Sequence, residues 1–176
     1  MNRVSGAKRA APLAAALVLG LAGCSDFGPK STAYTCPQAT TVPDLQTIAR
    51  LAPGGSDQDV QTAGRIASVN SVCKDEDGGV VANLSIDFTA LRTGPGIKHI
   101  DLPYFVAVAD ATGNILGKQV FAIGLDFPGE SATLKTTEKV TTHLPLKNPQ
   151  LGDIYTIIVG FQLTRNEVDF NRAHEE

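Results

Sequence analysis

The chain has 176 residues, with 15 Lys and Arg against 18 Asp and Glu, and 43% of its residues are hydrophobic. This length suits one domain with a sizeable core. The net negative charge argues against nucleic acid as a partner, because a phosphate backbone selects basic surfaces. The absence of Trp and an aromatic content of 6% argue against an aromatic-lined sugar site.

The N-terminus has the three parts of a secretory signal peptide. Arg3, Lys8 and Arg9 are basic, residues 13–22 are apolar, and Ala22-Gly23 places small side chains before Cys24. The apolar run is about half of the roughly 20 residues that a transmembrane helix needs. We therefore predict that residues 1–23 are a signal peptide.

The run Leu21-Ala22-Gly23-Cys24 resembles the lipobox of bacterial lipoproteins. The resemblance implies a diacylglyceryl thioether on Cys24, cleavage before it and acylation of the new amino group. Several fatty acyl chains hold a protein at a membrane far longer than one chain does. Cleavage without lipidation is the alternative. In the enterobacterial pattern an Asp directly after the Cys retains the protein at the inner membrane, so Ser25 implies the outer membrane.

Cleavage at this point would leave 153 residues with 12 Lys and Arg against 18 Asp and Glu. Anionic headgroups repel such a chain, so we expect the lipid, and not a basic face, to attach it to the membrane. Together with lipidated Cys24, residues 25–35 read as a flexible tether (24–35) with a reach of about 18 Å. A tether this short favours a partner within or beside the same bilayer.

Two cysteines, Cys36 and Cys73, remain once Cys24 is assigned to the lipid. In an oxidising periplasm two leftover cysteines most often form a disulfide, and we predict this bond. Two free thiols are the alternative. A redox pair is disfavoured, because the spacing is far from that of a C-x-x-C unit.

Residues 36–176 alternate strand patterns with turn signals. The clearest strand is 80–90, where apolar residues occupy every second position. Residues 42–51 fit either a short helix or a first strand. The remaining predicted strands are 66–73, 104–109, which is buried on both faces, 115–127, 133–144 at an exposed sheet edge, and 155–163.

About seven short strands at regular spacing indicate a single antiparallel β-sandwich, of the immunoglobulin or fibronectin-III type. Tyr155, at the start of a late strand, occupies the place of a tyrosine corner; a tyrosine that simply packs in the core is the alternative. Thr164 and Glu167 have the spacing of a capping box and predict a short helix over 165–173.

No residue pattern predicts a catalytic, metal or cofactor site. His99, His143 and His174 lack the spacing of metal ligands. The acidic stretch from Asp75 to Gly79 resembles the start of a calcium loop, but the apolar strand that follows favours a hairpin turn. Gln162 is either a ligand contact or a core or edge amide. We therefore expect no enzyme activity.

Three stretches, 102–108, 159–164 and 170–172, resemble small lipoproteins of alphaproteobacteria, and the similarity runs over 36–172. That family supplies no established activity. The sequence favours a lipid-anchored, non-catalytic binding or adaptor module that faces the periplasm and contacts an envelope protein. The alternatives are a structural envelope lipoprotein that stabilises a membrane complex, and an enzyme with an unrecognised site.

Overall fold

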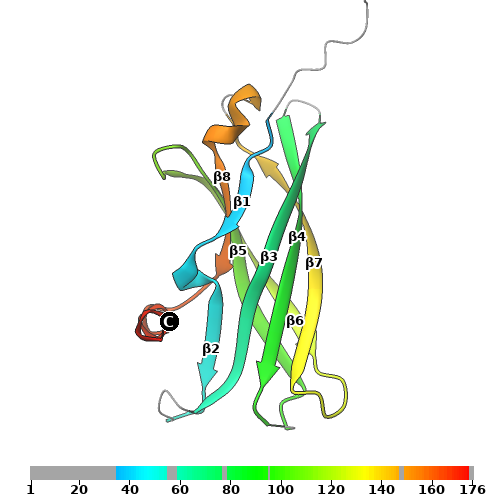
Figure 1. Ribbon diagram of the computed structural model, residues 1–176, viewed down its shortest axis with the longest axis vertical. Coiled ribbons are helices and arrows are strands. Elements are labelled where there is room, and N and C mark those ends of the chain that lie inside the picture. The colour runs from blue at the N-terminus through cyan, green and yellow to red at the C-terminus, as the bar shows by residue number, and fades with distance from the viewer. Residues whose placement is uncertain (1–34, 55–58, 77–78, 95, 147–148, 175–176) are drawn as a thin grey trace, which may run out of the picture. The chain divides into compact units, whose positions relative to one another are not determined.

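β-Strands dominate the chain in the computed structural model, which describes residues 35–54, 59–76, 79–94, 96–146 and 149–174 (Figure 1). The strands are β1 (Gln38–Thr41), β2 (Thr47–Leu51), β3 (Val60–Glu76), β4 (Gly79–Arg92), β5 (His99–Ala109), β6 (Ile115–Asp126), β7 (Thr133–Leu144) and β8 (Thr156–Phe161). Two 3-10 turns, η1 (Pro43–Leu45) and η2 (Pro149–Ile154), and one helix, α1 (Arg165–Ala173), complete the described elements.

The strands form two four-stranded sheets. One has the order β1-β8-β5-β6 and the other the order β2-β3-β4-β7. Every pair is antiparallel except β1 and β8, which run parallel from the pair of Gln38 and Thr156 onward. The chain is therefore rich in antiparallel sheet, as predicted, but the purely antiparallel arrangement is wrong at this pair. Parallel strands need a long connection, and here the rest of the domain supplies it.

The predicted hairpin of β3 and β4 is the longest pairing in the fold. Its register runs from Thr62 opposite Arg92 to Glu76 opposite Gly79, so residues 77–78 join the two strands. The acidic stretch from Asp75 is thus the end of a hairpin, as predicted. The strand predicted over 66–73 is the middle of β3, which extends beyond it at both ends, and a bulge between Ile66 and Ser68 shifts the alternation of β3.

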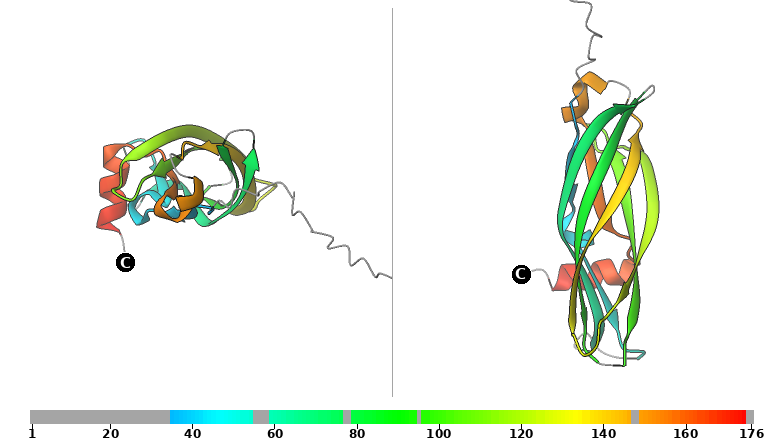
Figure 2. Two further views of the ribbon diagram at one scale, coloured as in Figure 1. Left: turned by 90° about the horizontal axis from the view of Figure 1, so that it is seen from above. Right: turned by 90° about the vertical axis from the view of Figure 1, so that its right-hand side faces the viewer.

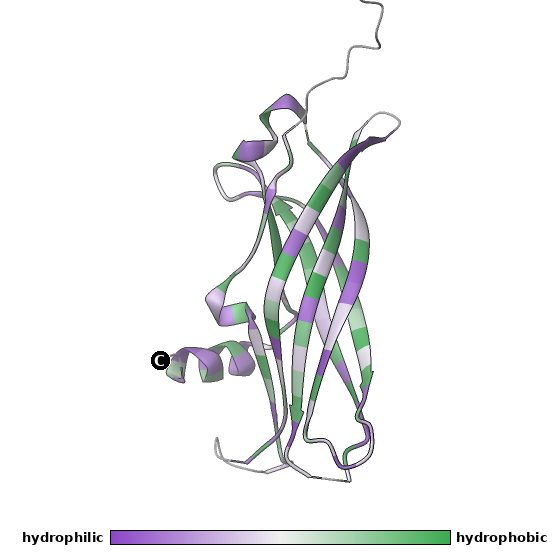
Figure 3. Ribbon diagram, turned by 45° about the vertical axis from the view of Figure 1, so that its right-hand side comes forward, coloured by the Kyte–Doolittle hydropathy of each residue, from purple (hydrophilic) through white to green (hydrophobic). Residues whose placement is uncertain are grey.

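Apolar side chains from both sheets meet in one core. Phe88 of β4 and Tyr104 of β5 make an edge-to-face contact with ring centroids 5.2 Å apart, and Phe161 of β8 lies beside Phe88. Along β3 and β4, apolar residues that face this core alternate with polar residues, and Figure 3 shows the alternation as bands of colour. Contacts of this kind show that the two sheets pack face to face.

The remaining predictions differ from the structure mainly at element ends. Residues 42–51 contain both predicted alternatives, since η1 leads directly into β2. The strand at 133–144 is confirmed and lies at a sheet edge. Residues 104–109 are buried, as predicted, but β5 begins earlier, at His99, and includes Pro103, where β8 has already ended.

A buried arginine closes one end of the two sheets. Arg92, 2% exposed, donates from Nε to the Ser131 carbonyl, from Nη1 to that of Ile97 and from Nη2 to that of Gly129. Its guanidinium also lies 5.0 Å from the centre of the Phe127 ring. One side chain thus fixes both the β4–β5 and the β6–β7 connections, a role that the sequence did not reveal.

Candidate functional site

The C-terminal helix forms part of a groove on the domain. Thr164 and Glu167 form the predicted capping box: the Thr164 hydroxyl accepts from the Glu167 amide, and the Glu167 carboxylate accepts from the Thr164 amide at 2.7 Å. α1 begins at Arg165 and ends at Ala173, as predicted. Figure 2 shows it lying outside the two sheets.

Polar contacts hold α1 against η1 and β2. The buried Asn171 amide donates to the backbone carbonyls of Asp44 and Thr47, each at 2.8 Å. Arg172 pairs with Asp44 at 2.7 Å, and Arg50 pairs with Glu167. Asn171 is the only buried residue of this helix, so directed hydrogen bonds and ion pairs place it, and hydrophobic burial contributes little.

A groove of about 420 Å³ lies between this helix and the second sheet. Pro43, Gln46 and Thr47 line it from η1 and the start of β2, Arg65 from β3, and Phe170, Asn171 and His174 from α1 and its end. Thr47 and Arg65 are directly paired across β2 and β3. Its size falls in the range typical of small-ligand sites, about 300–1,000 Å³.

Most polar atoms around the groove make hydrogen bonds within the fold, and a few do not. Gln46 pairs with Ile66 twice: its backbone carbonyl accepts from the Ile66 amide, and its Nε2 donates to the Ile66 carbonyl. The His174 ring stacks on Phe170 at 4.2 Å and contacts the Phe170 carbonyl through Nδ1. Within the described residues, the exposed Arg65 guanidinium has no ion pair or hydrogen bond.

Among the described residues, the groove therefore combines one cation without a partner, Arg65, with polar and aromatic lining residues. Arg50 and Arg172 are neutralised by carboxylates, so Arg65 leaves a local positive charge in a chain whose overall charge is negative. The sequence did not predict this site, since its residues come from segments more than 100 positions apart. The capping box was the one signal that pointed to this region, and it predicted a helix without its packing partner.

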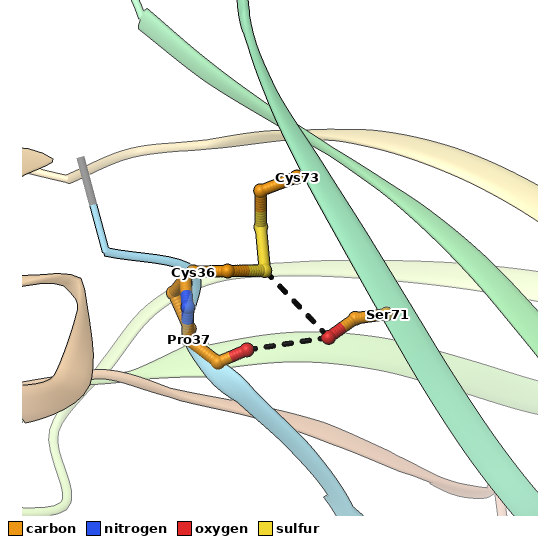
Figure 4. The surroundings of a disulfide bond; sticks show 4 residues. All are labelled: Cys36, Pro37, Ser71 and Cys73. Atoms are coloured by element: carbon orange, nitrogen blue, oxygen red, sulfur yellow. Dashed lines mark hydrogen bonds between the residues drawn. A yellow bond between two sulfur atoms is a disulfide. The ribbon is translucent and has the colours of Figure 1, made fainter. Parts of the chain in front are cut away.

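The two predicted disulfide cysteines come together. Cys36, just before β1, and Cys73, in β3, have Cα atoms 5.4 Å apart and are joined by a disulfide (Figure 4). The nearby Ser71 hydroxyl donates to the Pro37 carbonyl at 3.3 Å. The bond thus connects an edge strand of one sheet to the other sheet. Cys24, the predicted lipidation site, lies outside the described residues.

The three histidines are not brought together. His143 is exposed on β7, and His174 follows α1. His99 lies between two carboxylates, with Nδ1 2.7 Å from Asp126 and Nε2 3.3 Å from Asp101. These hydrogen bonds, that to Asp126 first, raise the pKa of His99 above its usual value. No group of metal-binding side chains occurs among the described residues.

Gln162 and Tyr155 are two further candidate residues, and their described contacts belong to the fold. Gln162 is exposed, and its backbone amide donates to the Pro103 carbonyl, which continues the pairing of β5 and β8. Tyr155 is 4% exposed and belongs to the core. Its hydroxyl has no hydrogen-bond partner among the described residues, so the described contacts fit the core tyrosine that was the alternative to a tyrosine corner.

One buried polar pair crosses the core. The Tyr104 ring stacks on Phe121, and its hydroxyl points toward Glu138 of β7. Burial, and to a lesser degree the nearby carboxylate, raises the pKa of Tyr104 well above its usual value, so the hydroxyl stays protonated. In the described structure neither the Tyr104 hydroxyl nor Glu138 Oε2 has a partner with hydrogen-bond geometry.

Comparison with known proteins supplies no relative. No protein-family model, curated protein or solved structure matches the chain. None of the helices in the described ranges is long and apolar enough to cross a membrane.

Proposed function

We propose that the chain is a lipid-anchored, non-catalytic binding module of the bacterial cell envelope that faces the periplasm. The chain has three cysteines, and the fold pairs two of them, Cys36 with Cys73. This pairing is the observation that supports the proposal. It uses two of the three thiols in a disulfide and leaves Cys24, in its lipobox-like context, as the thiol that can carry the acyl chains. A disulfide also suits an oxidising compartment.

In this proposal the groove beside α1 is the recognition site. Its volume suits a small ligand or the end of a chain, and Arg65 offers a charge that no described neighbour neutralises. The tether after Cys24 would keep the start of the domain within about 18 Å of the anchoring membrane. The partner would then be an envelope component in or beside that membrane, which Ser25 assigns to the outer membrane.

The proposed architecture is a variant of the immunoglobulin and fibronectin-III sandwich. In those folds strand B lies between A and E, and strand C lies between C′ and F. Here β4 lies between β3 and β7, and β5 lies between β6 and β8. With β8 as strand F, Tyr155 precedes that strand at the expected corner, and β1 takes the place of the last strand in parallel orientation.

Intact-mass spectrometry and detergent partitioning test the anchor. Protein purified from membranes of the native host should begin at Cys24 and carry the added mass of the acyl chains. Cys24→Ser should move the protein into the aqueous phase, because a chain without acyl groups lacks the stable membrane attachment that they give. Ser25→Ala is the matched control and should stay in the detergent phase. A native product that retains Met1 would refute the proposal.

A further inference from the structure

The residues that line the groove beside α1 match one kind of ligand group: a carboxylate next to an amide N–H. Arg65 supplies a fork of donors that matches the two oxygens of a carboxylate. Thr47, its direct partner across β2 and β3, adds a hydroxyl at the same wall. Two donors of this kind on neighbouring strands favour a planar anion over a neutral group.

Two amide side chains of the groove lining provide acceptors. Both Nδ2 hydrogens of Asn171 are used by the Asp44 and Thr47 carbonyls, so its side-chain oxygen is the atom of this amide that remains to accept a hydrogen bond. Gln46 donates through Nε2 to Ile66, which likewise leaves Oε1 as an acceptor. A groove lined by both a guanidinium and amide acceptors favours a ligand that carries a donor beside its negative charge.

The groove lining also has apolar members. Pro43 and Phe170 belong to it, and the Phe170 ring stacks on His174. A small apolar side chain would fit this surface, and the volume of about 420 Å³ has room for one or two residues of a peptide and not for a folded partner.

We propose that the groove binds the terminal carboxylate of a peptide, with Arg65 on the carboxylate, Asn171 or Gln46 on the adjoining amide N–H, and Phe170 under the last side chain. Capture of a chain terminus by a pocket of donors is a recurrent mode of peptide recognition. The inference rests on the proposed function, since it names the ligand class of that module. Two envelope sources share this chemistry: a protein C-terminus, and the D-amino acid end of a cell-wall peptide.

The test uses the full mature protein in detergent micelles and four probes: N-acetyl-L-alanine, N-acetyl-D-alanine, N-acetyl-alaninamide and inorganic phosphate. We expect at least one acetylalanine to shift the NMR signals of the Arg65 side chain and the Thr47 amide in a saturable way. The amide, which lacks the charge, should bind at least about tenfold more weakly, the loss expected for a charged hydrogen bond. The enantiomer that binds more tightly identifies the source.

Two variants complete the design. Arg65→Gln removes the cation from the groove and should weaken acetylalanine binding at least about tenfold. Lys139→Gln removes one exposed positive charge on the outer face of β7, away from the groove, and should leave binding unchanged. Equal binding of acid and amide, stronger binding of phosphate, or wild-type affinity in Arg65→Gln would overturn the inference. None of these results would alter the partitioning of the lipidated protein, so a failed anchor and a failed ligand are distinguishable.

Discussion

Loss of the disulfide should lower the stability of the domain more than any other change described here. The bond closes a loop between residues 37 positions apart. The loop-entropy relation gives about 13 cal/mol/K for this length, or about 4 kcal/mol at 25 °C. This is a large share of the roughly 5–15 kcal/mol that stabilises a typical domain. The Cys36→Ser, Cys73→Ser double variant should therefore unfold at a clearly lower urea concentration.

The fold explains why this bond matters beyond entropy. Cys36 immediately precedes β1, a strand of four residues that pairs only with β8. The bond to Cys73 and the Ser71 hydrogen bond to the Pro37 carbonyl both connect the start of the domain to β3 of the second sheet. We therefore expect β1 to lose hydrogen-exchange protection first when the bond is reduced.

Urea unfolding followed by far-UV circular dichroism measures the effect, since the chain has no Trp to report by fluorescence. The wild type with reductant should match the double variant without it. Ser71→Ala is the matched control: it keeps the bond, removes the hydroxyl beside Cys36 and Pro37, and should cost about 1 kcal/mol or less. An unchanged midpoint after reduction would refute the reasoning.

Three further predictions follow from single sites. Gly64→Ala places a Cβ 2.6 Å from the Leu102 side chain and should destabilise the core by about 1–3 kcal/mol, measured as a lower Tm; an unchanged Tm would contradict this packing. Arg92→Met removes the donors to three carbonyls and should cost about 2–4 kcal/mol in urea unfolding, with loss of exchange protection confined at first to the two connections it holds; uniform loss would argue against a local clamp. His99 should titrate above its ordinary pKa in NMR, and Asp126→Asn should lower that value. Since the folded pKa is raised, this stabilising contribution is complete below the ordinary histidine pKa and disappears as the pH rises through the folded value; a titration midpoint that Asp126→Asn leaves in place would contradict the assignment.

Local pattern predicted the strands where one face is buried and one is exposed. The strand over 80–90 became β4 because polar and apolar residues alternate along it, and 133–144, predicted as an edge strand from its richness in Thr, has the same bounds as β7. β3 was predicted only over its middle, 66–73, and the bulge at Ile66 and Ser68 breaks the period of two along this strand. β1 was missed because four residues of mixed polarity carry no periodic signal.

The same reasoning from local sequence pattern could not predict the candidate site. Arg65 reads in sequence as one more polar residue on a strand, and Phe170 as the apolar face of a short helix. Only the tertiary contacts of Asn171, which reach 127 and 124 positions back along the chain, place these residues around one groove. Pairing of Cys36 with Cys73 was predictable because two cysteines left over in a short chain most often form a disulfide under oxidising conditions, whereas arginine has many uses.

The contacts that hold α1 also make the groove, so binding and local stability are coupled. A helix of nine residues is marginal in water on its own, and this one buries only Asn171. Its position therefore depends on the Asn171 hydrogen bonds and on the ion pairs of Arg172 and Arg50. A ligand that touches both Arg65 on β3 and Phe170 on α1 would bridge the helix to the sheet and stabilise the docked helix in proportion to its affinity.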